Sequence, residues 1–258
     1  MKKDKQLHLN AKIICIHLFI FIIGWSADLK EIRSRVIPKL KIELNKKDLS
    51  IESQVFVRIF KQDKKLELWI KKDKTFEIFK MYPICEYSGE LGPKIKNGDR
   101  QAPEGIYKIK KNLLNPNSKL HLGINIGYPN EYDRYYKRNG SAIMIHGGCV
   151  SVGCYAMTDS LIEEIYVIFE ESLKHNKYVS VHIYPFELTS KNIDNHNNYI
   201  DTSFIGSLLA FIQNSPKYKY NEFIPFWKEL KAAYDFFEEN KILPSIQIIN
   251  GHYVISSK

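Results

Sequence analysis

The chain has 258 residues, 44% of them hydrophobic, and a net charge of +9 from 38 Lys and Arg against 29 Asp and Glu. This composition excludes a disordered, collagenous or low-complexity chain, and its four cysteines are too few for a disulfide-built scaffold. The basic excess suits an anionic cell wall or membrane surface, or no partner at all. The sequence has no arginine-rich stripe with interleaved aromatics and no zinc-finger spacing, which argues against nucleic acid as a partner.

The N-terminal segment has the three-part pattern of a secretory signal peptide. Several lysines precede the apolar run 13–23, and small residues follow it at Ser26 and Ala27. The run is shorter than the roughly 20 residues of a transmembrane helix, so an uncleaved inner-membrane anchor is the alternative, with a buried helix of the folded domain as a third reading. We therefore expect 1–26 to be a signal peptide or N-terminal anchor, the protein to be exported to the periplasm, and membrane contact to involve this segment only.

Short β-rich segments with alternating apolar residues come next, after a stretch at 27–53 that we assign to an N-terminal linker segment. Charged clusters separate these segments, which predicts antiparallel strands and hairpins. The predicted strands are 54–60, 66–71, 76–83, 105–110, 120–126, 142–145 and 178–184. The stretches 88–104 and 128–140 carry Gly, Pro, Asn and Asp, which predicts surface loops, where sites usually lie.

Helical patterns appear in the second half of the chain. Ser160 and Glu163 have the spacing of a capping box, and apolar residues then recur at helical intervals. Past Pro185 comes a polar linker, and 223–240 has the pattern of an amphipathic helix. Asn250-Gly251 between alternating apolar runs predicts a two-residue hairpin. The sequence therefore predicts an α+β fold: a mainly antiparallel β domain at 54–187 and a small helical and hairpin appendage at 188–258.

The stretch 143–159, IMIHGGCVSVGCYAMTD, holds the residues that point to chemistry. A strand-like segment delivers His146, the chain turns through Gly147 and Gly148, and Cys154 follows a second small step. A thiolate is a nucleophile and a nearby imidazole can remove its proton, so this pair is the minimum set for cysteine catalysis. The glycines let the backbone approach a substrate and could direct amides at a developing oxyanion.

Two other interpretations of this spacing remain open on the residues alone. The first is a buried thiol with a satisfied histidine. The second is a metal site of His146, Cys149 and Cys154, to which His121 could add a fourth ligand from another strand.

The same stretch resembles the catalytic motif of the L,D-transpeptidase (YkuD-type) family, in which His-Gly precedes Ser-x-Gly-Cys, and specifically its YafK-like branch. The likeness also includes 85–109, 115–134 and the terminal segment that begins at 226. The resemblance implies a catalytic domain of the L,D-transpeptidase type at 54–187. It also implies an enzyme that needs no metal or other cofactor and acts on peptidoglycan stem peptides, or on a protein linked to peptidoglycan.

The resemblance further implies a role for each residue of the motif. Cys154 would attack the stem-peptide bond after diaminopimelate and form a thioester, with His146 as its base, oriented by a backbone carbonyl in the neighbourhood of Gly147. Ser151 and Gly153 complete the motif, and the amides of Gly153 and Cys154 would be oxyanion donors. An amine would resolve the thioester by transpeptidation, or water by hydrolysis.

Two departures from the family pattern stand out. The family usually has Arg two residues after the cysteine, where this chain has Ala156, and the loop from His146 to Cys154 is short. Both departures favour hydrolysis of a link between diaminopimelate and an attached protein or peptide over ordinary cross-linking. A non-catalytic wall-binding or metal-binding protein that kept the fold is the alternative of a different class.

Four more residues are candidates for substrate binding. Arg100 and Arg134 lie in predicted loops and could pair with substrate carboxylates, although each could also be an exposed loop arginine. His121 could approach the site from a neighbouring strand or be structural. Tyr155, next to the nucleophile, could line the pocket or pack in the core.

Three cysteines remain once the leader is set aside: Cys85, Cys149 and Cys154. An odd number leaves at least one thiol unpaired within the chain. We expect that thiol to be Cys154, with Cys85 and Cys149 free or bonded to each other.

Overall fold

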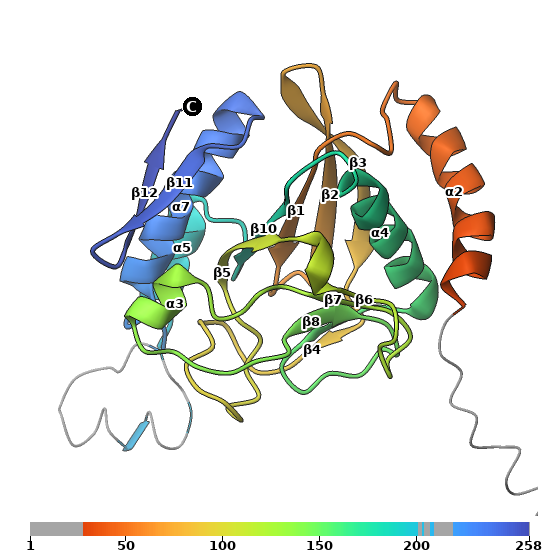
Figure 1. The fold of residues 1–258 in the computed structure, drawn as a ribbon. Coiled ribbons are helices and arrows are strands. Elements are labelled where there is room, and N and C mark those ends of the chain that lie inside the picture. Colours follow the sequence, from red (N-terminus) through yellow and green to blue (C-terminus); the bar gives the residue numbers. More distant parts are fainter. Residues whose placement is uncertain (1–27, 201–202, 204–206, 209–218, 258) are drawn as a thin grey trace, which may run out of the picture.

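The computed structural model describes residues 28–200, 203, 207–208 and 219–257, and its fold is α+β, as predicted (Figure 1). The predicted signal peptide or anchor at 1–26 lies outside the described residues. Within the described part of the chain, no helix is both long enough and apolar enough to cross a membrane.

The larger sheet has five strands in the order β3-β2-β1-β10-β5. Their bounds are β3 Thr75–Pro83, β2 Lys65–Lys72, β1 Val55–Phe60, β10 Val179–Tyr184 and β5 Gly105–Ile109. Only the β1–β10 pair of this sheet is parallel. Every residue of β1 and β10 is buried, because both faces of these central strands are covered by side chains of the hydrophobic core.

The smaller sheet consists of very short strands in the order β4-β9-β8-β7-β6. Their bounds are β4 Glu86–Tyr87, β9 Tyr155–Ala156, β8 Met144–His146, β7 Gly123–Asn125 and β6 Leu114–Asn115. The β8–β9 pair is parallel and brings the two halves of the Cys/His motif side by side. This sheet carries the candidate site.

Helix α4, Asp159–Ser172, packs against strands of both sheets, and its apolar residues belong to the same core. The predicted capping box at its start is wrong. The N-cap residue is Thr158, and it makes no side-chain capping bond. Glu163 is instead buried and pairs with Arg35 and His121. The helix therefore begins without a side-chain cap and is stabilised by packing.

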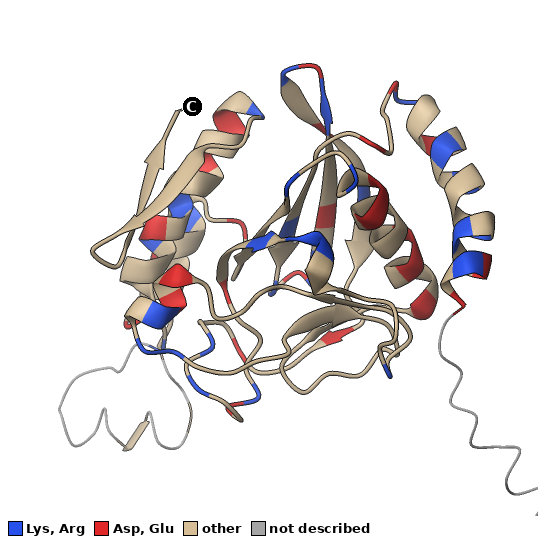
Figure 2. Ribbon diagram, viewed as in Figure 1, with Lys and Arg blue, Asp and Glu red and all other residues tan. Residues whose placement is uncertain are grey.

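Helix α2, Leu29–Asn45, lies within the stretch assigned to a linker. Its buried residues recur every four positions, at Ile32, Val36, Leu40 and Leu44, and they join the main core. This stripe is narrow and Pro38 lies inside the helix, so the sequence pattern did not show a helix. Figure 2 shows basic residues of α2 beside acidic residues of α4, and Arg33 pairs with Glu170 across this contact.

The C-terminal region contains the predicted helix and hairpin. Helix α7, Ile224–Asn240, is followed by β11, Ser245–Ile249, and β12, His252–Ser256. Asn250 and Gly251 both have positive φ, as the predicted two-residue turn requires. The region is packed on the large sheet, since Phe237 of α7 lies against Phe56 at 4.7 Å between ring centroids.

Two short helices occur where the sequence analysis expected only a linker or a loop. Helix α5, Ser190–Asn197, lies in the predicted polar linker, and α3, Glu131–Tyr135, lies in the predicted loop 128–140. Each begins with a side-chain cap, from Thr189 for α5 and from Asn130 for α3. A 3₁₀ turn, η2 Lys111–Leu113, completes the elements discussed here.

Candidate active site

His146 is the last residue of β8, and its side chain is held in one orientation. The residue is 2% exposed, and its Nδ1 donates a hydrogen bond to the Gly147 carbonyl oxygen at 2.6 Å. A carbonyl can only accept, so Nδ1 carries the proton and Nε2 is left with its lone pair. Among the described residues Nε2 has no hydrogen-bond partner. His146 therefore has the orientation predicted for it, with a backbone carbonyl as the orienting group.

Cys154 directly precedes β9, at the edge of the same sheet. The parallel register pairs Ile145 with Tyr155 and His146 with Ala156, so one step back along both strands places Cys154 beside Met144. The Met144 amide donates to Cys154 Sγ at 3.4 Å. Side chains two residues apart on a strand share a face, so this register places the thiol and the imidazole on the same face of the sheet.

Both groups are neutral at rest. Burial lowers the pKa of His146, and the hydrogen bond to Gly147 opposes this only in part. Burial also raises the pKa of the Cys154 thiol, against the opposing effects of the Met144 amide and of the charge of Lys94. A neutral imidazole beside a neutral thiol suits proton removal by a general base during attack, rather than a preformed ion pair.

Ser151 shapes the turn that leads into Cys154. Its Oγ accepts hydrogen bonds from the amides of Gly153 at 3.2 Å and Cys154 at 3.0 Å, and donates to the Cys154 carbonyl at 2.8 Å. The two amides predicted as oxyanion donors are thus directed at Ser151 in this structure. Ser88 adds a hydroxyl contact to Ser151 at 3.1 Å, so the turn is also held from the β4 side.

The glycine after the histidine is required by its surroundings. A Cβ at Gly147 would lie 2.5 Å from Asp159 Oδ1 and 3.0 Å from the Cβ of His121. The same Asp159 oxygen accepts a hydrogen bond from the Gly148 amide at 2.8 Å. The first turn of α4 therefore fixes the path of the chain directly after His146.

A disulfide between Cys85 and Cys149 fixes the middle of the motif loop, and Cys154 is free. The prediction of a free Cys154 is therefore confirmed, and of the two alternatives for the other cysteines the structure has the bonded one. Cys149 in a disulfide is not a metal ligand. Within the described ranges, no group of three or more His, Cys, Asp and Glu side chains is placed to hold a metal ion.

His121 and Tyr155 lie beside the motif but do not face the thiol. His121 Nε2 donates to Glu163 Oε1 at 2.8 Å. Tyr155 is fully buried, and its hydroxyl donates to the Pro103 carbonyl at 2.6 Å. Of the two roles that the sequence left open for Tyr155, the structure therefore has the packing role, while His121 supports the motif loop through α4.

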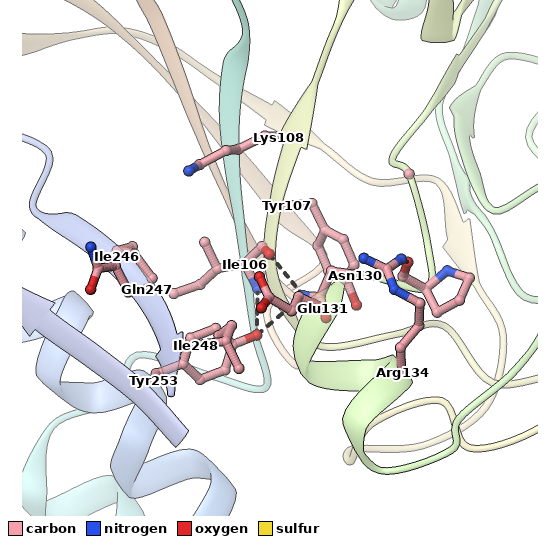
Figure 3. Close-up of a pocket in the computed structure, with 12 residues that line it drawn as sticks. Ile106, Tyr107, Lys108, Asn130, Glu131, Arg134, Ile246, Gln247, Ile248 and Tyr253 are labelled. Carbon is pink, nitrogen blue, oxygen red and sulfur yellow. Dashed lines mark hydrogen bonds between the residues drawn. The ribbon is translucent and has the colours of Figure 1, made fainter. Parts of the chain in front are cut away.

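The two candidate arginines differ in their surroundings. Arg100 is exposed in the loop after β4. Arg134 is on α3 and lines a cavity of about 240 Å³ between β5, α3 and β11 (Figure 3). No residue of the 143–159 motif lines that cavity. The structure thus places Arg134 at another cavity, while Arg100 is one residue before Gln101, whose carbonyl oxygen would be 3.8 Å from a Cβ at Gly153.

The sequence analysis missed a buried ion pair that anchors the loop 88–104. Lys61 Nζ and Glu104 Oε1 are 3.1 Å apart, and both side chains are 0% exposed. Glu104 also accepts from the Gly92 amide and from Trp227 Nε1 of α7, both at 2.7 Å. The one hint in the sequence was that Glu104 directly precedes the predicted strand at Gly105. An acidic residue in a polar loop is usually exposed, so the sequence did not predict that Glu104 is buried. The same loop carries Lys94, which the sequence analysis also passed over.

Comparison with known proteins agrees with this geometry. Residues 54–174 match the model of the YkuD L,D-transpeptidase catalytic domain. The chain is 40% identical over 205 residues to the Escherichia coli K12 protein named "Putative L,D-transpeptidase YafK", an alignment that spans 79% of this chain and 74% of that protein. The protein belongs to the L,D-transpeptidase family.

Among solved structures, the chain is similar to the helical cell shape determining protein Pgp2 of Campylobacter jejuni, with 19% identity, a TM-score of 0.43 and coverage of 82% of this chain and 80% of that one. It is also similar to Bd1075 of Bdellovibrio bacteriovorus, with 15% identity, a TM-score of 0.39 and coverage of 75% and 76%. At these TM-scores neither likeness supports a conclusion.

Proposed function

We propose that the protein is an exported cysteine enzyme that cleaves the peptidoglycan stem-peptide bond after diaminopimelate through a thioester on Cys154. The observation that supports this most directly is the hydrogen bond from His146 Nδ1 to the Gly147 carbonyl. It leaves Nε2 as a base on the face that carries the one free thiol of the described residues. Family membership supports the substrate class.

The chemistry follows from the two neutral groups. The Cys154 sulfur attacks the carbonyl carbon while its proton moves to His146 Nε2. The C–N bond then breaks, His146 returns the proton to the leaving amine, and the acyl group remains on sulfur as a thioester. In the second half an amine or water loses a proton to His146 and attacks the thioester, and the thiol regains a proton as the C–S bond breaks.

Hydrolysis is the second candidate outcome of the same intermediate. Ala156 stands where family members usually have Arg, and it is fully buried in β9 between β4 and β8. No guanidinium can therefore reach an acceptor carboxylate from this position. Loss of such a grip disfavours a peptide acceptor more than it disfavours water, and a protein linked to diaminopimelate would then be released rather than exchanged.

The place of action that fits this substrate is the periplasm. The leader-like segment 1–26 supports export, and the net charge of +6 on residues 27–258, from 34 Lys and Arg against 28 Asp and Glu, supports attraction to an anionic wall polymer. Subcellular fractionation of cells that produce the full chain tests this part separately from the chemistry.

The main experiment is digestion of purified sacculi by the wild-type protein and by Cys154→Ala, with mass spectrometry of the released fragments. We expect the variant to lose product formation and to form no covalent adduct with a carbapenem-like probe. Ser160→Ala is the matched control, because Ser160 is exposed and its hydroxyl contacts only Thr158. Digestion in heavy-oxygen water distinguishes the outcomes: the label enters the new carboxylate on hydrolysis and is absent after transfer.

Two results would contradict the proposal. Full activity of Cys154→Ala would show that Cys154 is not the nucleophile. Equal binding of both proteins to sacculi, with no product from either one, would instead favour a non-catalytic wall-binding protein.

A further inference from the structure

Lys94 is a buried cation in the loop between β4 and β5. Its side chain is 4% exposed, and its Nζ donates to Asp99 Oδ1 at 2.5 Å and to the Lys96 carbonyl at 3.0 Å. Asp99 accepts further hydrogen bonds from the amides of Ile95, Lys96 and Gln101. These donors hold the pKa of Asp99 below its usual value, so the carboxylate stays charged and keeps the ammonium in place.

Lys94 lies next to the segment 139–142, which borders the Cys154 thiol and forms one wall of its surroundings. A Cβ at Gly140 would be 2.8 Å from Lys94 Cε and 3.7 Å from its Nζ. Two residues further on, the Ala142 carbonyl is the acceptor of the Cys154 thiol at 3.7 Å. The segment 139–142 therefore lies between Lys94 and Cys154.

Further hydrogen bonds join the same two segments. The Asn139 amide donates to the Ile95 carbonyl at 3.1 Å, and Asn139 Oδ1 accepts from the Asn97 amide at 2.8 Å. The Tyr128 hydroxyl donates to the Lys94 carbonyl at 3.1 Å. The loop 94–99 and the wall of the thiol thus form one fixed unit, with the charge of Lys94 inside it.

The charge of Lys94 acts on the thiol in a known direction. It opposes the rise in the pKa of Cys154 that burial causes, and it is the one side-chain cation of the described residues with such an effect. The other titratable groups around the thiol are His146 from β8, Tyr155 from β9 and Asp99 behind Lys94. Ala156, where the family has Arg, contributes no charge.

We propose that Lys94, held by Asp99, is a positioning residue of the Cys154 site: its ammonium provides the positive charge that Ala156 does not, and its side chain supports the wall segment 139–142. The proposal deepens the proposed function and rests on Cys154 being the nucleophile. Lys94 acts on the thiolate through the field of its charge, without touching the reacting atoms.

The test is the pH dependence of iodoacetamide alkylation of Cys154 in the full chain, without reductant. Peptide mass spectrometry separates Cys154 from Cys15, and the disulfide protects the other two cysteines. We expect Lys94→Gln, which keeps a hydrogen-bond donor but loses the charge, to shift the profile to higher pH. At about pH 8 alkylation should be about three- to tenfold slower, since the smaller thiolate fraction is partly offset by the greater nucleophilicity of the more basic thiolate.

Two companion variants make the result specific. Lys94→Arg keeps the charge and should restore most of the wild-type profile. Lys96→Met removes a neighbouring exposed lysine and should leave the profile unchanged. A folded Lys94→Gln protein with the wild-type profile would overturn the proposal, as would an equal shift in Lys96→Met. If Lys94→Gln does not fold, Lys94→Met, which keeps the length of the side chain without its charge, replaces it and should give the same shift, and a folded Lys94→Met protein with the wild-type profile would overturn the proposal.

This measurement needs no turnover. A failure of the proposed function, such as an active Cys154→Ala enzyme, would leave the alkylation profiles unaffected, so the two failures are distinguishable.

Discussion

Each of the two sheets contains a buried histidine, and the two side chains are satisfied differently. His182 of β10 is 0% exposed, with Nε2 at 3.2 Å from Ser180 Oγ and Nδ1 at 2.9 Å from the Tyr184 hydroxyl. His146 of β8 is also buried, but only its Nδ1 is engaged within the described residues, and its partner is a backbone carbonyl. Burial alone therefore does not single out a candidate catalytic histidine; the free Nε2 of His146, on a strand next to the one that follows Cys154, distinguishes it from His182.

The two sheets that contain these histidines also differ in the interactions that stabilise them. The central strands β1 and β10 of the large sheet have six residues each, and they are stabilised by packing on both faces. The strands of the small sheet have two or three residues each. A disulfide, the Ser151 hydroxyl and the Asp159 carboxylate hold the loop between β8 and β9. The active-site geometry thus depends on a few specific bonds, whereas the large sheet depends on many nonspecific contacts.

The largest expected effect separates the two histidines directly. His146→Gln should lower product formation from sacculi at least about a hundredfold, because a general base is lost, while its melting temperature stays near that of the wild type. His182→Gln should cost about 1–3 kcal/mol of unfolding free energy through imperfectly paired buried groups, with normal activity per folded molecule. Activity assays and denaturant titrations of both variants check this. A reversed pattern would show that the roles of the two residues are assigned the wrong way round.

The next effect concerns the bond that fixes the motif loop. Replacing both Cys85 and Cys149 by Ser removes a link between residues 64 positions apart. The free energy of unfolding should fall by about 2–4 kcal/mol, since the unfolded chain is less constrained. Activity should fall as well, because the loop between His146 and Cys154 loses a support. Thermal unfolding with and without reductant measures the effect.

The double Ser variant provides its own control for that experiment. Reductant should lower the melting temperature of the wild type and leave the variant unchanged. An unchanged wild-type melting temperature, with both thiols shown free by mass spectrometry, would contradict a stabilising role for the disulfide.

Near neutral pH the smallest effect is a dependence of stability on pH, which grows as the pH falls. Burial, with smaller contributions from the charges of Arg58 and Lys108, lowers the pKa of His182 from 6.5 to about 3. Between these values the unfolded chain binds a proton that the folded chain does not, so stability decreases as the pH falls through this window. The contribution is at most about 1.4 kcal/mol per pH unit.

Denaturant titrations across this pH window measure the slope. His182→Leu should flatten the dependence, and His175→Gln, a change at an exposed histidine, should not. Equal slopes in both variants would assign the pH dependence to other groups.

The sequence predicted those parts of the molecule in which local pattern and tertiary role agree. Alternation in 54–60 and 66–71 marks strands that are strands in the structure, and Asn250-Gly251 forms the hairpin turn. The spacing of His146 and Cys154 and the surrounding glycines left thiol chemistry, a buried thiol and a metal site open, and the fold places the two residues on neighbouring strands. In these segments the residues adopt the local structure that their type most often adopts.

The remaining features depend on partners that are distant in the chain. Glu163 has the spacing of a cap but pairs with Arg35 and His121. Arg134 has suitable chemistry for a carboxylate but lies at another cavity. Lys94 looks like one of many exposed lysines until the fold buries it beside the wall of the thiol. Charged side chains are thus the least predictable, because their neighbours decide their role.

The buried ion pair of Lys61 and Glu104 has a consequence for how the chain can be divided. Glu104 is shared between the large sheet, the loop that carries Lys94 and Trp227 of the C-terminal region. A chain that ended near residue 187 would lose the indole donor to this carboxylate and uncover Phe56 of β1, against which Phe237 packs. The C-terminal region is thus bonded to and packed against the large sheet and the loop that carries Lys94, and we expect its removal to destabilise both.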